Sequence, residues 1–310
     1  MSPLDAVDHY NRYEEDIKMV AEAGLNAYRF SIEWARIEPK QGVYDENEIE
    51  HYRKVLTCCR ENGVEPIVTM MHFTSPKWLI ENGGWENEAT VEAFKNYCQY
   101  VTEQLGDLMH YVCTINEANM GIQVAAISAR YRAQMMAKMQ RMQQGGAEEK
   151  KDLEGPAQVG MNFNDMMANM QKQKEENVEI FGTDTLQTFV SARTPEGDML
   201  VIRAHQAARA AMKAVKPELQ IGLTLSLHDI QAQEGGEETA AKEWVDEFTH
   251  YVPYIKEDDF FGLQNYSRSL IGPNGILPVP EGAEITQMDY EYYPEGLEHV
   301  IRRVYEEMPM

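Results

Sequence analysis

The sequence predicts an α/β protein folded as a (β/α)8 barrel, or TIM barrel, of which about five of the eight strands are present. Along the 310 residues, short apolar segments alternate with amphipathic helical segments, a pattern typical of parallel strands joined by crossover helices. Polar and aromatic residues follow each strand, as they do at the rim of a barrel. An open doubly wound sheet would show the same alternation. However, no glycine motif of the kind that cradles nucleotide phosphates opens a helix here, so we favour the barrel.

The first third of the chain alternates regularly between helical spacing of apolar residues and short β-prone runs. Apolar residues at helical spacing run over residues 10–20 and 49–59, and these helices are expected to stop at Gly24 and Gly63, since glycine suits a helix C-terminus. A third helix is predicted over residues 91–105 by the same spacing. Each helix is followed by a short β-prone run, and these strands are predicted over residues 27–32, 65–71 and 110–115.

The alternation resumes in the last third of the chain. Helices are predicted over residues 197–215, 238–250 and 294–307, the last one opening at Pro294, a residue favoured in a first helical turn. Strands are predicted over residues 220–226 and 259–263, followed by a long loop punctuated by Pro and Gly. We expect residues 1–310 to form a single, partial barrel domain.

The regular rhythm is interrupted by a segment over residues 130–180 that is rich in Met, Gln, Lys and Glu. Methionine suits an adaptable surface, so the segment could line an outer substrate subsite or act as a lid. We prefer the hypothesis of a helical insertion after the strand that ends at residue 115. The methionines concerned are Met135, Met136, Met139, Met142, Met161, Met166, Met167 and Met170.

The composition excludes several classes of function. There are 28 Lys and Arg against 51 Asp and Glu, and this net charge of −23 repels nucleic-acid backbones and anionic membrane surfaces. No apolar run is long enough to span a bilayer, and no signal peptide is visible. The four cysteines, Cys58, Cys59, Cys98 and Cys113, lack C-x-x-C spacing. We therefore expect reduced thiols, a cytoplasmic location, and neither a nucleic-acid nor a membrane partner.

Glu117 is the candidate with the clearest chemistry. It comes directly after the predicted strand at 110–115, and a carboxyl at the rim of an apolar barrel is partly desolvated. Desolvation raises the pKa of a carboxyl group and makes it a proton donor near neutral pH. Asn116 beside it offers a donor and an acceptor to a polyhydroxylated ligand. The alternative, that Asn116 and Glu117 merely cap the following helix, is equally compatible with their position.

His72 and Arg29 are the next candidates. His72 ends the second predicted strand, where a lone histidine is more often structural than functional. A metal site would need further ligands at short range, and no such motif occurs, so no metal is expected. Arg29 lies inside the first predicted strand and is expected to be buried. A buried arginine must be paired, so a carboxylate is expected in the barrel interior, in a functional or an ordinary structural ion pair.

These motifs, in this order, resemble family 1 glycoside hydrolases, the β-glucosidase-like enzymes. The resemblance covers essentially everything outside the insertion. The matching segments are 9–16, 24–37, 61–69, His72, 83–85, 114–117, 260–268 and 293–297.

The resemblance implies a retaining β-glycosidase that needs no cofactor and acts on terminal β-linked sugars. In that family the glutamate of the T-x-N-E-P motif is the general acid/base, which implies this role for Glu117. It further implies that Asn116 and His72 bind sugar hydroxyls and that Arg29 pairs with the nucleophilic carboxylate. Asn265 aligns with the tyrosine that usually contacts the nucleophile in the family, and Tyr266 is next to it, so both are expected at the substrate site. Ala118 replaces the usual proline.

The family's nucleophile, the glutamate of a T-E-N-G motif, is not found. Glu61 and Glu81 each precede Asn-Gly, but neither is on a late strand. The strands that the family numbers one, seven and eight are also expected to be missing. The two outermost predicted strands, 27–32 and 259–263, would then each have an unpaired edge, so we expect self-association or a complementary chain.

Two classes of function therefore remain open. The first is a β-glycosidase whose second carboxylate comes from another chain or from the rest of a longer gene product. The second is a catalytically incomplete relative that binds sugars or another protein. Retaining glycosidases need two carboxyl groups about 5–5.5 Å apart, and this sequence supplies only one of them.

Overall fold

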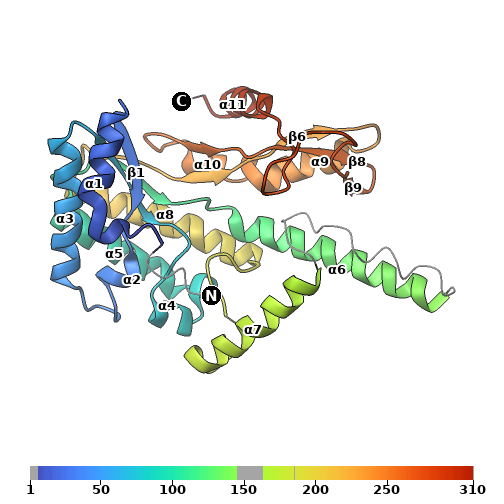
Figure 1. Ribbon diagram of the computed structural model, residues 1–310, viewed down its shortest axis with the longest axis horizontal. Coiled ribbons are helices and arrows are strands. Elements are labelled where there is room, and N and C mark those ends of the chain that lie inside the picture. Colours follow the sequence, from blue (N-terminus) through green and yellow to red (C-terminus); the bar gives the residue numbers. More distant parts are fainter. Residues whose placement is uncertain (1–5, 145–162, 185, 310) are drawn as a thin grey trace. The chain divides into compact units, whose positions relative to one another are not determined.

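The computed structural model describes residues 6–144, 163–184 and 186–309, which form helices and strands in alternation (Figure 1). The chain divides into two compact units. The first unit comprises residues up to 116 together with 200–224 and 257–262. The second unit comprises residues 117–199, 225–256 and 263–310.

The first unit contains a parallel sheet of four strands in the order β1-β2-β3-β4. Because consecutive strands are neighbours and parallel, the helical segments between them act as crossovers. The strands are β1 (Ala27–Ser31), β2 (Glu65–Met71), β3 (Tyr111–Ile115) and β4 (Gln220–Gly222). The strands expected at 27–32, 65–71 and 110–115 are thus found with almost the expected ends.

The helices of the first unit also lie close to their predicted positions. Asp45 caps α3, since its carboxylate accepts a hydrogen bond of 2.9 Å from the backbone N–H of Asn47. Gly24 and Gly63 follow α1 and α3 with φ of +78° and +68°, the left-handed conformation that ends a helix. The helices are α1 (His9–Glu22), α2 (Trp34–Ile37), α3 (Glu46–Glu61), α4 (Lys77–Glu81), the 3₁₀ turn η1 (Gly84–Glu86) and α5 (Ala89–Leu105). Most of α8 (Pro195–Val215) also belongs to this unit.

The strand expected over 220–226 is divided into β4 and β5 (Thr224–Ser226). β4 pairs with β3, whereas β5 pairs with β7 (Gly262–Gln264). The chain passes very close to its neighbour here, because a Cβ on Gly222 would lie 2.1 Å from the carbonyl oxygen of Phe260. The strand expected at 259–263 begins later than predicted. Its first residue, Asp259, instead holds β4 from the side, since its carboxylate accepts the N–H of Ile221 at 2.9 Å.

The second unit contains a small sheet of three strands, two of which, β8 (Arg268–Gly272) and β9 (Gly275–Ile276), lie in the segment expected to be a long loop. β6 (Asp229–Ala232) pairs with β8 in parallel, and β8 pairs with β9 in a tight hairpin. Gly275 has a φ of +104°, which only glycine adopts easily, and this conformation permits the two-residue turn. The helices are α6 (Met120–Gln144), α7 (Phe163–Phe181), α9 (Glu237–Trp244), the π-helical turn η3 (Val245–Thr249), α10 (Val252–Ile255) and α11 (Glu295–Glu307).

The Met-rich segment is helical wherever the structure describes it. α6 starts at Met120, ten residues before the expected start of the insertion, and α7 ends at Phe181 (Figure 1). Residues 145–162, which include Met161, lie outside the described residues. The single-domain assignment and the insertion boundaries of 130 and 180 therefore stay predictions. In the described ranges, no helix combines the length and apolarity that crossing a membrane requires.

All four cysteines are buried and free. Burial raises the pKa of the Cys59 thiol to about 12 and that of the Cys98 thiol well above its ordinary value. The pKa values of Cys58 and Cys113 are raised for the same reason. These side chains therefore act as small apolar groups, and Cys58 and Cys59 belong to a buried cluster with Ile17, Val55 and Val64.

The buried cluster predicts a large effect for one truncation on α1. Ile17 is fully buried against α3, so Ile17→Ala should lower the free energy of unfolding by about 2–5 kcal/mol. The matched control is Met19→Ala on the same helix. Met19 is 57% exposed, and its truncation should change stability by less than about 0.5 kcal/mol. Urea denaturation followed by circular dichroism measures both. Equal effects would contradict the packing described here.

Candidate active site

The candidate residues fall into two groups, one in each unit. Arg29, His72 and Asn116 lie in the first unit, and Glu117, Asn265 and Tyr266 lie in the second. In the first group His72 and Asn116 directly follow β2 and β3, whereas Arg29 lies inside β1. In the second group Glu117 follows Asn116, and Asn265 and Tyr266 follow β7. This arrangement is expected where parallel strands end at one edge of a sheet.

Asn116 directly follows β3 and is buried. Its backbone N–H donates to the carbonyl oxygen of Met71 at 2.9 Å, which continues the pairing of β3 with β2. Its side-chain oxygen accepts hydrogen bonds from Arg29 Nη2 at 2.8 Å and from the Thr224 hydroxyl at 3.4 Å. Its Nδ2 is buried and has no hydrogen-bond partner in the part of the chain that the structure describes. The amide is therefore oriented, with donor capacity left for a ligand oxygen.

The expectation that Arg29 is buried in an ion pair is wrong. Arg29 is exposed, and no described carboxylate lies within ion-pair distance of it. The physical reason is its strand: β1 pairs with β2 along one edge only, and Arg29 lies next to the open edge. The guanidinium is held by the amide oxygen of Asn116 instead.

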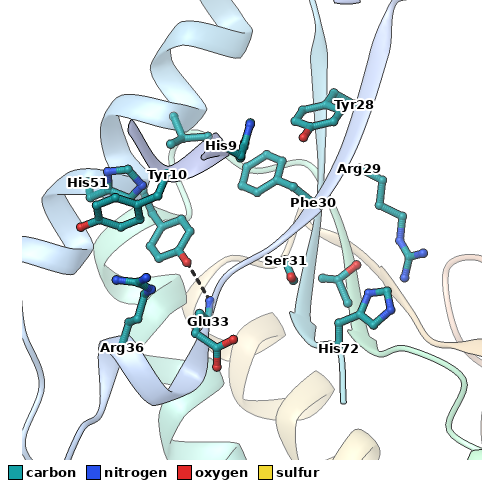
Figure 2. Close-up of a pocket in the computed structure, with 13 residues that line it drawn as sticks. His9, Tyr10, Tyr28, Arg29, Phe30, Ser31, Glu33, Arg36, His51 and His72 are labelled. Atoms are coloured by element: carbon teal, nitrogen blue, oxygen red, sulfur yellow. Dashed lines mark hydrogen bonds between the residues drawn. The ribbon is translucent and has the colours of Figure 1, made fainter. Parts of the chain in front are cut away.

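A cavity of about 470 Å³ runs along this open edge of β1. Figure 2 shows Arg29 and His72 on one side of β1, with Tyr10 and His51 on the other. Desolvation and the nearby Arg29 guanidinium lower the pKa of His72, so its imidazole is neutral at neutral pH. The residue after it, Phe73, has a φ of +72°, an uncommon conformation for a residue with a side chain.

Glu117 follows Asn116 and begins the second unit. Its side chain is buried, and its φ of +45° places the backbone in the left-handed region. One carboxylate oxygen, Oε1, accepts hydrogen bonds from Gln264 Nε2 at 2.8 Å and from the Tyr266 hydroxyl. Gln264 Nε2 also lies 3.0 Å from the Tyr266 oxygen, so the three groups form one cluster. Burial and the hydrogen bond to Glu117 raise the pKa of Tyr266 to about 12.

The two residues expected beside the substrate differ in what they contact. Asn265 donates both amide hydrogens to the backbone, to the carbonyl oxygens of Leu227 at 2.9 Å and Ser267 at 3.0 Å. The Asn265 amide nitrogen therefore links two loops. Its side-chain oxygen is the atom left to contact a substrate, and that contact stays a prediction. Tyr266 is about half exposed and reaches the carboxylate of Glu117 itself.

Three residues of the two groups were not singled out from the sequence. Gln264 is the last residue of β7, and the expected strand ended one residue too early to place it at the rim. Thr224 lies inside the run that the sequence reads as one unbroken strand. Asn119 is fully buried and bonds the backbone of Ser226 in both directions, at 2.7 Å and 3.0 Å. The only sequence signal for Asn119 was its position, two residues after Glu117. Across the described residues, no cluster of three or more His, Cys, Asp or Glu could hold a metal ion.

The sequence that contains Arg29, His72 and Asn116 is similar to known proteins. Residues 4–144 match the model of glycosyl hydrolase family 1. The chain is 40% identical over 113 residues to β-glucosidase A of Acetivibrio thermocellus, a match that covers 36% of this chain and 25% of the relative. It is also 40% identical over 117 residues to the human cytosolic β-glucosidase, with 37% and 25% covered.

The fold extends this similarity to almost the whole chain. The crystal structure of the β-glycosidase BGL167 superimposes with a TM-score of 0.78 and 37% sequence identity, covering 98% of this chain and 66% of that one. The prediction of an incomplete (β/α)8 barrel is confirmed by this similarity. The chain thus spans about a quarter of the length of the curated relatives in sequence and 66% of this solved structure in fold.

The cavity residues give a test with a defined sign. Desolvation and Arg29 both lower the pKa of His72, so Arg29→Gln should raise that pKa toward its ordinary value of about 6.5. Desolvation still lowers the pKa in this variant, so the pKa should not reach the ordinary value. Imidazole titration by ¹H–¹⁵N NMR measures it. The matched control is Arg36→Gln. Arg36 helps lower the pKa of His51, after desolvation, so this variant should raise the pKa of His51 and leave His72 unchanged. A His72 pKa that is insensitive to Arg29→Gln would refute the assignment.

Proposed function

We propose that this chain, whose residues 4–144 carry the sequence of glycosyl hydrolase family 1, provides the acid/base carboxyl group of a retaining β-glycosidase. The observation that carries the proposal is the position of Glu117. It is a buried carboxyl at the end of a parallel strand, with one oxygen fixed by Gln264 and Tyr266. A general acid must be held in place and shielded from water, and this geometry does both.

In the proposed reaction Glu117 donates its proton to the glycosidic oxygen as the bond to the anomeric carbon breaks. In the second half-reaction the same carboxylate takes a proton from the water that attacks the glycosyl–enzyme bond. The Tyr266 hydroxyl, with its pKa near 12, stays protonated throughout and keeps donating to the carboxylate. It therefore favours the ionised form of Glu117 once the proton has left.

The remaining candidates are proposed to bind the sugar. Asn116 presents an unsatisfied amide donor, which suits a hydroxyl oxygen. A neutral His72 has one donor and one acceptor nitrogen, which suits a second hydroxyl group. The proposed substrates are terminal β-linked, glucose-like sugars. The proposed location is the cytoplasm, as the name of the human cytosolic relative suggests.

The proposal requires a second carboxylate to attack the anomeric carbon. Retaining enzymes place it about 5–5.5 Å from the acid/base, and the T-E-N-G motif that carries it in the family does not occur in this sequence. We therefore assign the nucleophile to residues outside this sequence, which act together with Glu117.

One observation favours a second candidate function, a sugar-binding or interaction protein without catalysis. Arg29 is expected to pair with the nucleophilic carboxylate. In the described part of the chain it pairs with the amide of Asn116 instead. An arginine satisfied by an amide no longer requires a carboxylate, which is compatible with a site that only binds.

Hydrolysis of aryl β-glucosides by the purified 310-residue chain tests the proposal. Formate is added as a small carboxylate able to occupy the place of the missing nucleophile. We expect negligible turnover without formate and measurable turnover with it. Glu117→Gln should lower the formate-dependent rate about 10²-fold for substrates with poor leaving groups, because they depend on the general acid.

The matched control is Glu22→Gln, which removes an exposed carboxylate from α1 and should leave the rate unchanged. Turnover that survives Glu117→Gln would exclude Glu117 as the acid/base. Binding of glucosides, seen by saturation-transfer NMR, without turnover in formate would support the sugar-binding alternative.

We further propose that another strand pairs with the open edge of β1. Asn26 accepts from the N–H of Glu65, and Ile32 donates to the carbonyl oxygen of Thr69, so the even-numbered residues of β1 bond to β2. The odd-numbered residues Ala27, Arg29 and Ser31 then direct their backbone N–H and C=O groups to the open edge. Such an edge pairs readily with a strand of a second copy or of a complementary chain.

Multi-angle light scattering measures this association. The chain should show a mass above the 35.5 kDa of a monomer. Ala27→Pro should lower that mass, because proline removes one N–H from the open edge and is tolerated at the first residue of a strand. Ala27→Ser keeps the N–H and serves as the control. A wild-type chain that is monodisperse at 35.5 kDa would overturn the proposal.

A further inference from the structure

The backbone turn that carries Glu117 adopts an uncommon conformation. Glu117 has a φ of +45°, in the left-handed region that residues with a Cβ seldom occupy. Such a residue keeps this conformation only where its surroundings fix it. The contacts of residues 118–121 therefore decide where the Glu117 carboxyl is held.

Arg193 contacts this turn at both ends. Its Nη1 donates to the carbonyl oxygen of Ala118 at 3.0 Å, directly after Glu117. Its backbone N–H donates to the carbonyl oxygen of Gly121 at 3.1 Å. Its Nη2 donates to the carbonyl oxygen of Phe189 at 2.7 Å, and the guanidinium lies over the Phe189 ring, 4.5 Å from its centre. Arg193, through its side chain and its own backbone N–H, thus clasps the turn to the segment before α8.

The clasp is buried and electrically balanced. The Arg193 side chain is only 2% exposed, and Asp198 lies 3.8 Å from its Nη1. Asp198 is fixed in turn by the Tyr251 hydroxyl at 2.8 Å and by His250 Nε2 at 3.0 Å. Burial alone would lower the pKa of His250, but its bonds to Asp198 and to the Val245 carbonyl oxygen raise it. A buried guanidinium needs such partners, so this set is built to keep Arg193 in place.

Gly121 provides the space that the clasp fills. A Cβ added there would lie 2.6 Å from Cζ and 2.7 Å from both Nε and Cβ of Arg193. Any larger residue at this position would displace the guanidinium from the turn. Asn119 holds the same turn independently, through the backbone of Ser226. Loss of the clasp should therefore alter the turn locally without releasing it.

We propose that Arg193 is a positioning residue for Glu117, which acts by holding the Ala118 carbonyl and thereby the left-handed turn that presents the carboxyl to Gln264 and Tyr266. This role rests on the proposed function of Glu117 as the acid/base. Arg193 acts through the backbone and not through contact with a substrate. The hydrogen bond from Tyr266 to Glu117 is the local reporter of the alignment.

The test measures the ¹³Cζ chemical shift of Tyr266 in the full chain at neutral pH, assigned with Tyr266→Phe. This shift reports donation by the phenol, and Glu117→Gln sets the value for a lost charged acceptor. Arg193→Met should move the shift at least half of the way to the Glu117→Gln value. The matched control, Arg130→Met, breaks the ion pair with Glu243 in the same unit and should leave the shift unchanged.

Gly121→Ala gives a second measurement, which keeps the charge of Arg193 and its partner Asp198 but pushes the guanidinium aside. It should move the Tyr266 shift in the same direction, and it decides the matter if Arg193→Met does not fold. An unchanged Tyr266 shift in folded Arg193→Met or in folded Gly121→Ala would overturn the proposal. Because the readout needs no turnover, a chain that fails to hydrolyse glycosides contradicts only the proposed function.

Discussion

Parallel pairing of β1, β2, β3 and β4 is the constraint on which the candidate site depends. In a parallel sheet all carboxyl ends lie at one edge, so the residues that follow successive strands are brought together although they are far apart in sequence. Arg29 lies inside β1 and Asn116 directly follows β3, and the hydrogen bond of 2.8 Å between their side chains joins parts of the same sheet that are 87 positions apart. Each connection between successive strands contains a long helix, α3, α5 or α8, and the sequence of the first unit is organised around these crossovers.

Local patterns were sufficient to predict the parallel strands and their helices, because each strand carries its own apolar run and each helix its own spacing. β6, β8 and β9 could not be predicted, since polar or glycine residues interrupt their short apolar runs. The prediction that Arg29 is buried was wrong because burial depends on whether a further strand covers it, and the residues of β1 do not indicate this. Glu117 could be predicted from its motif, whereas its partner Gln264 lies 147 positions away and depends on where β7 ends.

The two groups of candidate residues differ in how fully their hydrogen bonds are satisfied. Glu117, Gln264 and Tyr266 form a complete arrangement for holding one carboxyl group. The Asn116 amide, by contrast, has a buried Nδ2 without a hydrogen-bond partner among the described residues. Asn116 follows β3, and β2 lies between β3 and β1. The open edge of β1 is therefore next to Arg29 and not next to the unpaired amide of Asn116.

The buried cysteines have a practical consequence for work on this chain. A thiol with a raised pKa forms little thiolate, and the thiolate is the form that alkylating reagents attack. The native protein should thus resist iodoacetamide and maleimides without removal of Cys58, Cys59, Cys98 or Cys113. A cysteine introduced at the surface becomes a selective attachment point for a fluorophore or spin label. Reaction of the native thiols, in turn, reports the opening of the first unit's interior.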